Sequence, residues 1–146
     1  MNSQAVVPDA SVLLKWYLHV DEPFRYQAML LYERFTRGEV LLFLPDVALY
    51  ELGNRLLRLP NSGLEMFKDA LDLLGETVSL GHDEMEKIAE RVSGLHRRGL
   101  RNATFYDVAY IQVAHMGGIP LMTADMLQAE AAHSLGVETV LLKDYV

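Results

Sequence analysis

Four acidic residues of this chain stand in apolar stretches, apart from the acids that cluster on polar segments: Asp9, Glu51, Asp107 and Asp125. Asp9 ends the run VVPD, Glu51 lies within VALYELGNRLL, and Asp125 closes IPLMTAD. Burying an unpaired carboxylate costs several kcal/mol, because the charge loses its hydration. Each of these acids therefore needs a helix cap, a basic partner or a metal ion.

If the four acids converge, they predict a particular chemistry. Carboxylates that meet in one crevice repel one another, which raises their pKa values unless a cation lies between them. Clustered oxygen ligands select Mg²⁺ or Mn²⁺, which keep several waters and bind substrate phosphates directly. The acids thus predict metal-assisted hydrolysis of a phosphoester without a protein nucleophile. Thr123 lies two residues before Asp125 on an extended segment, so its hydroxyl points to the same side and can orient a ligand water.

Each acid also has a purely structural explanation, and the sequence does not decide between that explanation and metal binding. Asp9 and Asp125 stand where helices are expected to begin and can cap them. Thr104 and Asp107 fit the T-x-x-D capping box, in which the acid bonds back to the cap backbone. Glu51 can pair with the arginine four residues later on a solvated helix face. Capping and metal binding are compatible for Asp107 if one carboxylate oxygen serves each.

The periodicity of the chain predicts how these residues are positioned. Strands are expected at residues 5–7, 39–45, 76–80, 119–123 and 137–142, and helices at 11–18, 23–38, 46–59, 63–75, 82–99, 104–118 and 126–136. Strands that alternate with helices of this length indicate a three-layer α/β/α sandwich with a mainly parallel sheet. Residues 104–118 are apolar nearly all round, so this helix is expected to be central. Ligands of such sheets bind beyond the carboxyl ends of the strands. Asp9 and Asp125 fall at such ends.

The composition narrows the class of protein. The 146 residues, of which 51% are hydrophobic, predict one domain over 1–146. The absence of cysteine excludes disulfides, thiolate nucleophiles and zinc–sulfur sites, and the five histidines show no metal-binding spacing. The net charge of −7 argues against broad wrapping of nucleic acid, although the cluster of Arg97, Arg98 and Arg101 can receive phosphate locally. No apolar run is long enough to span a membrane, so we expect a cytoplasmic protein.

The ordered set of motifs resembles a known family. VVPDASVLLKW, LPDVALYELGNRL, TFYDVAYIQVA and PLMTAD follow one another between residues 6 and 125, and this set resembles the PIN domain, particularly the VapC-type toxin ribonucleases of toxin–antitoxin pairs. The resemblance implies that the metal ligands are Asp9, Glu51, Asp107 and Asp125. It places Thr123 in the family's T-x-D position and Ser11 beside the first acid.

The resemblance also implies an activity and partners. These are Mg²⁺- or Mn²⁺-dependent cleavage of single-stranded RNA that leaves a 3′-hydroxyl and a 5′-phosphate, homodimers, and inhibition by an antitoxin protein that inserts a segment into the site. Two alternatives are a non-catalytic PIN-like binding module whose acids serve as caps and a Mg²⁺-dependent phosphoacceptor domain. The phosphoacceptor domain is disfavoured, because a receiver domain has adjacent acids after the first strand. A haloacid-dehalogenase-type phosphatase, which has D-x-D, is disfavoured too, because here Asp9 is followed by Ala10 and Ser11.

Overall fold

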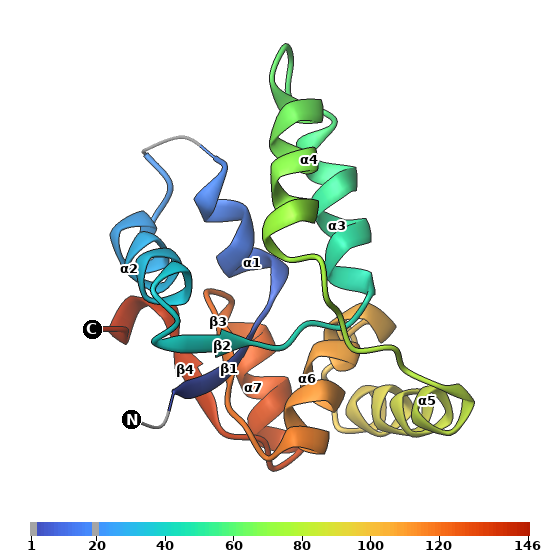
Figure 1. Ribbon diagram of the computed structural model, residues 1–146. Helices are drawn as coiled ribbons and strands as arrows, with labels where there is room; N and C mark the ends of the chain where they lie inside the picture. The colour runs from blue at the N-terminus through green and yellow to red at the C-terminus, as the bar shows by residue number, and fades with distance from the viewer. Residues whose placement is uncertain (1–2, 19–20) are drawn as a thin grey trace.

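A parallel four-stranded sheet lies at the centre of the fold in a computed structural model that describes residues 3–18 and 21–146 (Figure 1). Its strands are β1 (Gln4–Pro8), β2 (Val40–Leu42), β3 (Leu121–Thr123) and β4 (Thr139–Leu141), in the order β2-β1-β3-β4. β1 pairs with β2 on one side and with β3 on the other, and β3 pairs with β4. The predicted parallel sheet is confirmed. One of the five histidines, His19, lies outside the described residues.

Helices cover both faces of this sheet, as expected for a three-layer sandwich. Their bounds are α1 (Ala10–Leu13), α2 (Arg25–Thr36), α3 (Val47–Leu56), α4 (Gly63–Leu73), α5 (His82–Arg97), α6 (Phe105–Gly117) and α7 (Met126–Ser134), with 3₁₀ turns at Leu14–Trp16 and Leu142–Asp144. Figure 1 shows α1 and α2 on one side of the sheet and α6 and α7 on the other, while α3 and α4 form a hairpin that rises from the body. No helix in the described residues is long and apolar enough to cross a membrane.

The central helix, α6, is apolar nearly all round, as its sequence predicts. Its residues 108–114 are all buried, and it contacts both β1 and β3. Gln112, the polar side chain in this stretch, accepts a hydrogen bond from Arg91 at 2.7 Å and donates one to Glu84 at 2.5 Å, and both partners lie on α5. The capping box of Thr104 and Asp107 starts the helix, and Gly118 ends it in the left-handed conformation with φ 60°. Both ends of α6 are therefore fixed by local sequence.

The prediction of a strand at residues 76–80 is wrong. This segment makes a single bridge, from Val78 to Pro45, and joins no ladder. Val78 N donates to the carbonyl of Leu44 at 2.7 Å, and the pairing does not continue because the partner segment enters α3 at Val47. The segment is held instead by Thr77 and Ser79, whose hydroxyls bond Asp46. It is a connection between α4 and α5 rather than a fifth strand.

Candidate active site

The carboxyl ends of β1 and β3 lie side by side, because these two strands are parallel neighbours in the sheet. After β1 the chain forms β2 on one side of β1, and later it forms β3 on the other side. Such a switch in direction opens a crevice beyond the strand ends. Asp9 directly follows β1, Thr123 is the last residue of β3, and Asp125 stands two residues further on. The predicted position of these residues at the strand ends is confirmed.

A cavity of about 290 Å³ opens at this place, and all four predicted acids line it. Asp9 comes from β1, Glu51 from α3, Asp107 from α6 and Asp125 from the start of α7. Asp9 is buried, Glu51 and Asp107 are half-buried, and Asp125 is exposed at the rim. The other lining residues are Ala10, Ser11, Leu14, Asn54, Arg55, Tyr110 and Gln128. The structure therefore brings the four acids around one hollow, with one acid at its floor.

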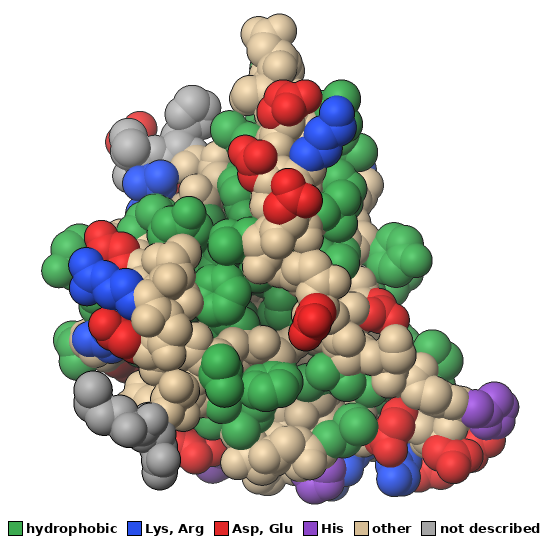
Figure 2. Space-filling model, viewed as in Figure 1, with side chains coloured by type: hydrophobic (Ala, Val, Ile, Leu, Met, Phe, Trp, Pro, Cys, Tyr) green, Lys and Arg blue, Asp and Glu red, His purple; other side chains and the backbone are tan. Residues whose placement is uncertain are grey.

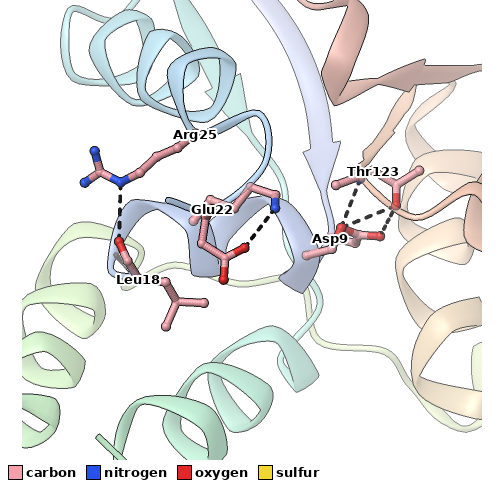
Figure 3. A network of polar contacts seen from close by, with 8 residues as sticks. Asp9, Leu18, Glu22, Arg25 and Thr123 are labelled. Atoms are coloured by element: carbon pink, nitrogen blue, oxygen red, sulfur yellow. Dashed lines mark hydrogen bonds and ion pairs between the residues drawn. The ribbon is translucent and has the colours of Figure 1, made fainter. Parts of the chain in front are cut away.

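Asp9 has neither of the ordinary partners that a buried carboxylate needs. It occupies the N-cap position of α1, yet its side chain makes no capping hydrogen bond of normal geometry, and the N–H groups of Ser11 and Val12 lie only near enough to lower its pKa. Among the described residues it forms no salt bridge, and Lys15, the nearest base in the sequence, pairs with Glu22 at 3.3 Å instead (Figure 3). Since only 6% of Asp9 is exposed, its charge is not solvated by bulk water. Of the three explanations for this acid, the helix cap and the basic partner are not observed.

Two hydroxyl groups hold the carboxylate of Asp9 in place. Ser11 Oγ donates to Oδ1 and Thr123 Oγ1 donates to Oδ2, each at 2.5 Å. The backbone N–H groups of Ala124 and Asp125 donate to these hydroxyls at 3.0 Å, which directs the hydroxyl protons toward Asp9. Figure 3 shows Thr123 and Asp9 side by side at the strand ends. Burial raises the pKa of Asp9 from 3.8 to about 6, and the hydroxyls and the first-turn N–H groups of α1 act in the opposite direction.

Glu51 is held by a tyrosine of α6. Tyr110 Oη donates to Glu51 Oε1 at 2.8 Å, and Tyr110 is almost completely buried. Burial raises the pKa of Glu51, the hydrogen bond from Tyr110 lowers it, and the nearby charge of Asp107 raises it. Burial and the adjacent carboxylates raise the pKa of Tyr110 as well, so this hydroxyl stays protonated. The predicted pair of Glu51 with Arg55 does not form within the described residues, although Arg55 lines the same cavity.

Asp107 and Asp125 both act as helix caps, as the capping alternative predicts. Asp107 Oδ2 accepts the N–H of Thr104 at 3.1 Å, and Asp125 Oδ1 accepts the N–H of Leu127 at 2.9 Å. Each cap uses one oxygen of the carboxylate. The second oxygen of each accepts no hydrogen bond from the described part of the chain. Capping therefore leaves both acids with a donor oxygen for a metal ion.

The donor set at the cavity fits a hard divalent cation. All four side chains offer carboxylate oxygens, and the raised pKa values of Asp9 and Glu51 reflect charge that a cation would offset. No three of these four carboxylates have ligand atoms within 4.8 Å of one another. Within the described ranges, the set that meets this distance is His82, Asp83 and Glu86, all exposed on the first turn of α5. Figure 2 shows acidic side chains there and over α4, the surfaces where we expect solvated acids.

The sequence did not identify two residues that hold the acids. Tyr110 and Gln128 each follow a predicted acid by three residues on a helix, so they share its face. Gln128 Nε2 donates to the carbonyl of Asp107 at 2.9 Å and ties α7 to α6. Helical spacing from the acids is the signal by which the sequence could have identified both residues.

Solved structures of similar fold support this architecture, whereas no protein family and no curated protein matches the chain. FitAcB from Neisseria gonorrhoeae aligns with a TM-score of 0.72 and 14% identity, over 95% of this chain and 99% of the other. The chain has the PIN-like α/β/α fold. DNA-bound VapBC from Salmonella typhimurium aligns at a TM-score of 0.68 and 15% identity, over 95% and 98%. VapC20 from Mycobacterium tuberculosis, described as a sarcin–ricin loop cleaving toxin, aligns at 0.64 and 17%, over 86% and 94%.

Proposed function

We propose that this chain is a single PIN-like nuclease domain over residues 1–146 that hydrolyses phosphodiester bonds of single-stranded RNA with a divalent metal ion. The observation that carries this proposal is Asp9, a buried carboxylate without cap or counter-charge, at the floor of a cavity lined by three further acids. A cation beside such a group offsets the cost of burying its charge.

In this proposal Mg²⁺ or Mn²⁺ is held by carboxylate oxygens of Asp9, Glu51, Asp107 and Asp125. When bound, the ion polarises the phosphate, lowers the pKa of a water and offsets charge on the leaving oxygen. The protein supplies the positions of its ligands. Ser11 and Thr123 hold both oxygens of Asp9, and Tyr110 fixes Glu51. Such partners restrict the orientations of Asp9 and Glu51, while the carboxylates must approach one another to share one ion.

The proposal also assigns partners. Some proteins of the same fold are complexes described as VapBC or FitAB, and one is described as a toxin that cleaves the sarcin–ricin loop. We propose by analogy that the chain is the toxin of a toxin–antitoxin pair, acts on RNA in the cytoplasm, forms a homodimer and is inhibited by a partner protein. The homodimer is supported by a groove of about 350 Å³ lined by Tyr50, Met85, Phe105 and Tyr106, which are exposed aromatic and apolar side chains.

Cleavage of RNA by matched variants tests the activity. The chain, its Asp107→Asn variant and the control Asp69→Asn are incubated with end-labelled single-stranded RNA in Mg²⁺, in Mn²⁺ and in EDTA. Asn can still cap α6 but offers a poorer metal ligand, so Asp107→Asn should lose cleavage by at least about a hundredfold. Asp69 is exposed on α4 and its variant should cleave normally. Equal cleavage by all three proteins would contradict the metal-site assignment.

Thermal melting with added metal separates the nuclease from a module whose acids are only caps. A divalent ion that binds the native state raises the melting temperature, and an ion without a site does not. We expect Mg²⁺ to raise the melting temperature of the parent and of His82→Ala but not of Asp9→Asn. A rise that survives in Asp9→Asn and disappears in His82→Ala would move the site to the exposed set on α5.

A further inference from the structure

A second hollow, which we call the side cleft, adjoins the acid cavity. It has a volume of about 240 Å³ and shares Asp107, Asp125 and Gln128 with the acid cavity. Its other walls come from the 99–103 segment and from α7, and are Gly99, Leu100, Arg101, Asn102, Ala103, Leu127 and Ala131. Because the two hollows share three residues, they adjoin each other, and one ligand can occupy both.

We propose that the side cleft binds the nucleotide next to the cleaved phosphodiester, with Arg101 contacting its phosphate and Gln128 the edge of its base. This inference rests on the proposed nuclease function and names a subsite for it. Leu100, Ala103 and Leu127 supply apolar wall, which suits the face of a base, and Arg101 and Gln128 supply polar groups. Proteins recognise single-stranded RNA by such contacts to unstacked bases and their edges.

Arg101 is the cation of the 97–101 cluster that is free to meet a phosphate. Arg98 is engaged elsewhere, because it donates to Ser134 O at 3.0 Å and to Ser134 Oγ at 2.8 Å. Arg97 donates to Ser93 at 2.9 Å on its own helix. Arg101 is exposed and pairs with no acid in the described part of the chain, although Asp107 and Asp125 line the same cleft. In a protein with a net charge of −7, this position offers local attraction for a phosphate.

Gln128 supplies an unused acceptor from the floor of the side cleft. Only 5% of the residue is exposed, and its Nε2 is fixed by the carbonyl of Asp107 at 2.9 Å. Its Oε1 accepts no hydrogen bond from the described residues, and the side chain lines both hollows. This oxygen is not one of the fully buried side-chain atoms that lack a partner in the described residues, so water reaches it, and an N–H group on a base edge that enters the cleft can take the place of that water.

Binding of RNA to inactive protein tests the subsite separately from catalysis. Asp9→Asn is introduced as a background mutation, because Asp9 does not line the side cleft. A fluorescent single-stranded RNA dodecamer is then titrated in Mg²⁺ at several salt concentrations. In this background, Arg101→Ala should weaken binding about tenfold and reduce the slope of log K against log salt by about 0.7, the value for one phosphate contact on a single strand. Arg101→Lys, which keeps the charge, should restore most of the slope.

Arg37→Ala is the matched control, because Arg37 is an exposed arginine at the end of α2 that lines neither hollow. It should bind as the background protein does. Identical salt slopes for Arg101→Ala and Arg37→Ala would overturn the inference, even if the unmutated protein cleaves RNA. A reduced slope for Arg101→Ala alone would support the subsite, even if the unmutated protein bound RNA without cleaving it and the nuclease proposal failed.

A change in base preference tests the role of Gln128. Gln128→Met keeps the length of the side chain and removes the acceptor, and a melting curve shows whether it folds. We expect it to bind RNA but to lose discrimination among homopolymers by about tenfold, the effect of one lost base-edge hydrogen bond. A folded variant with unchanged discrimination would remove Gln128 from the subsite.

Discussion

Asp9→Asn should make the metal-free protein more stable at neutral pH, although it removes a proposed catalytic group. Asp9 is buried without a counter-charge, and its charged form is held only by neutral hydrogen-bond donors. A neutral amide of the same shape does not carry the desolvation cost of a carboxylate. The variant therefore separates the effect of the buried Asp9 charge on the free energy of unfolding from the contribution of Asp9 to metal binding.

The magnitude follows from the pKa. Burial raises the pKa of Asp9 from 3.8 to about 6, and at 1.36 kcal/mol per pH unit this corresponds to about 3 kcal/mol of lost stability at neutral pH. The native state holds its proton to higher pH than the unfolded chain, so stability is present below about pH 4 and is lost as pH rises to about 6. In the variant, the NH₂ group of Asn faces one of the two hydroxyls that donate to Asp9 in the parent, so that hydroxyl has to reorient and accept. This rearrangement costs about 1 kcal/mol of unfolding free energy at every pH. The net gain expected near pH 8 is about 2 kcal/mol.

Urea unfolding in EDTA measures this difference. Trp16 is a suitable reporter, because it is the only tryptophan and is buried in the core with its indole N–H on the carbonyl of Ala28 at 2.8 Å. Between about pH 4.5 and pH 8, the unfolding free energy of the variant minus that of the parent should rise by about 2 kcal/mol. The constant hydrogen-bond cost cancels in this comparison.

A pH-independent difference between the two proteins would refute the reasoning, because it would mean that Asp9 titrates normally in the fold. A variant less stable than the parent at pH 8 would show that the hydroxyls of Ser11 and Thr123 hold the charge better than burial penalises it. Added Mg²⁺ should reverse the order, since the parent gains stability by binding the ion and the variant does not.

Two further substitutions test the groups that position the acids. Tyr110→Phe removes the hydrogen bond to Glu51 and should weaken Mg²⁺ binding, measured by calorimetry, about tenfold. The control is Tyr26→Phe on α2, because Tyr26 is exposed. Equal Mg²⁺ affinities of the two variants would show that Glu51 does not depend on Tyr110. Thr104→Ala removes one half of the capping box of α6 and should lower the unfolding free energy by about 1 kcal/mol in urea. No change for Thr104→Ala would mean that packing of α6 alone fixes its first turn.

Local sequence determined much of this protein. The alternation of helices and strands predicted the parallel sandwich, and residues 104–118, which are apolar nearly all round, predicted a central helix. The capping roles of Asp107 and Asp125 followed from residues within three positions of each acid. These features depend on neighbours in the chain, so periodicity and spacing are sufficient to find them.

The isolated acids were also visible in the sequence, because a carboxylate in an apolar run has to be explained by something beyond its neighbours. That property marked Asp9, Glu51, Asp107 and Asp125, and all four line one cavity. The sequence did not decide what holds Asp9, since a helix cap was an equally good explanation. The structure places Asp9 at the cap position without a capping bond.

The partners of the acids were decided by tertiary structure. Thr123 donates to Asp9 across 114 residues and Tyr110 donates to Glu51 across 59, because strand order and helix packing bring these positions together. The same packing turns Arg98 to Ser134 and leaves Arg101 beside the acids, although the two arginines look equivalent in the sequence. The strand predicted at 76–80 failed for a related reason, since a strand forms only where a neighbouring backbone can pair with it. Residue type and spacing determine the local elements and the chemistry available, whereas hydrogen-bond partners far apart in the chain are decided when the sheet assembles.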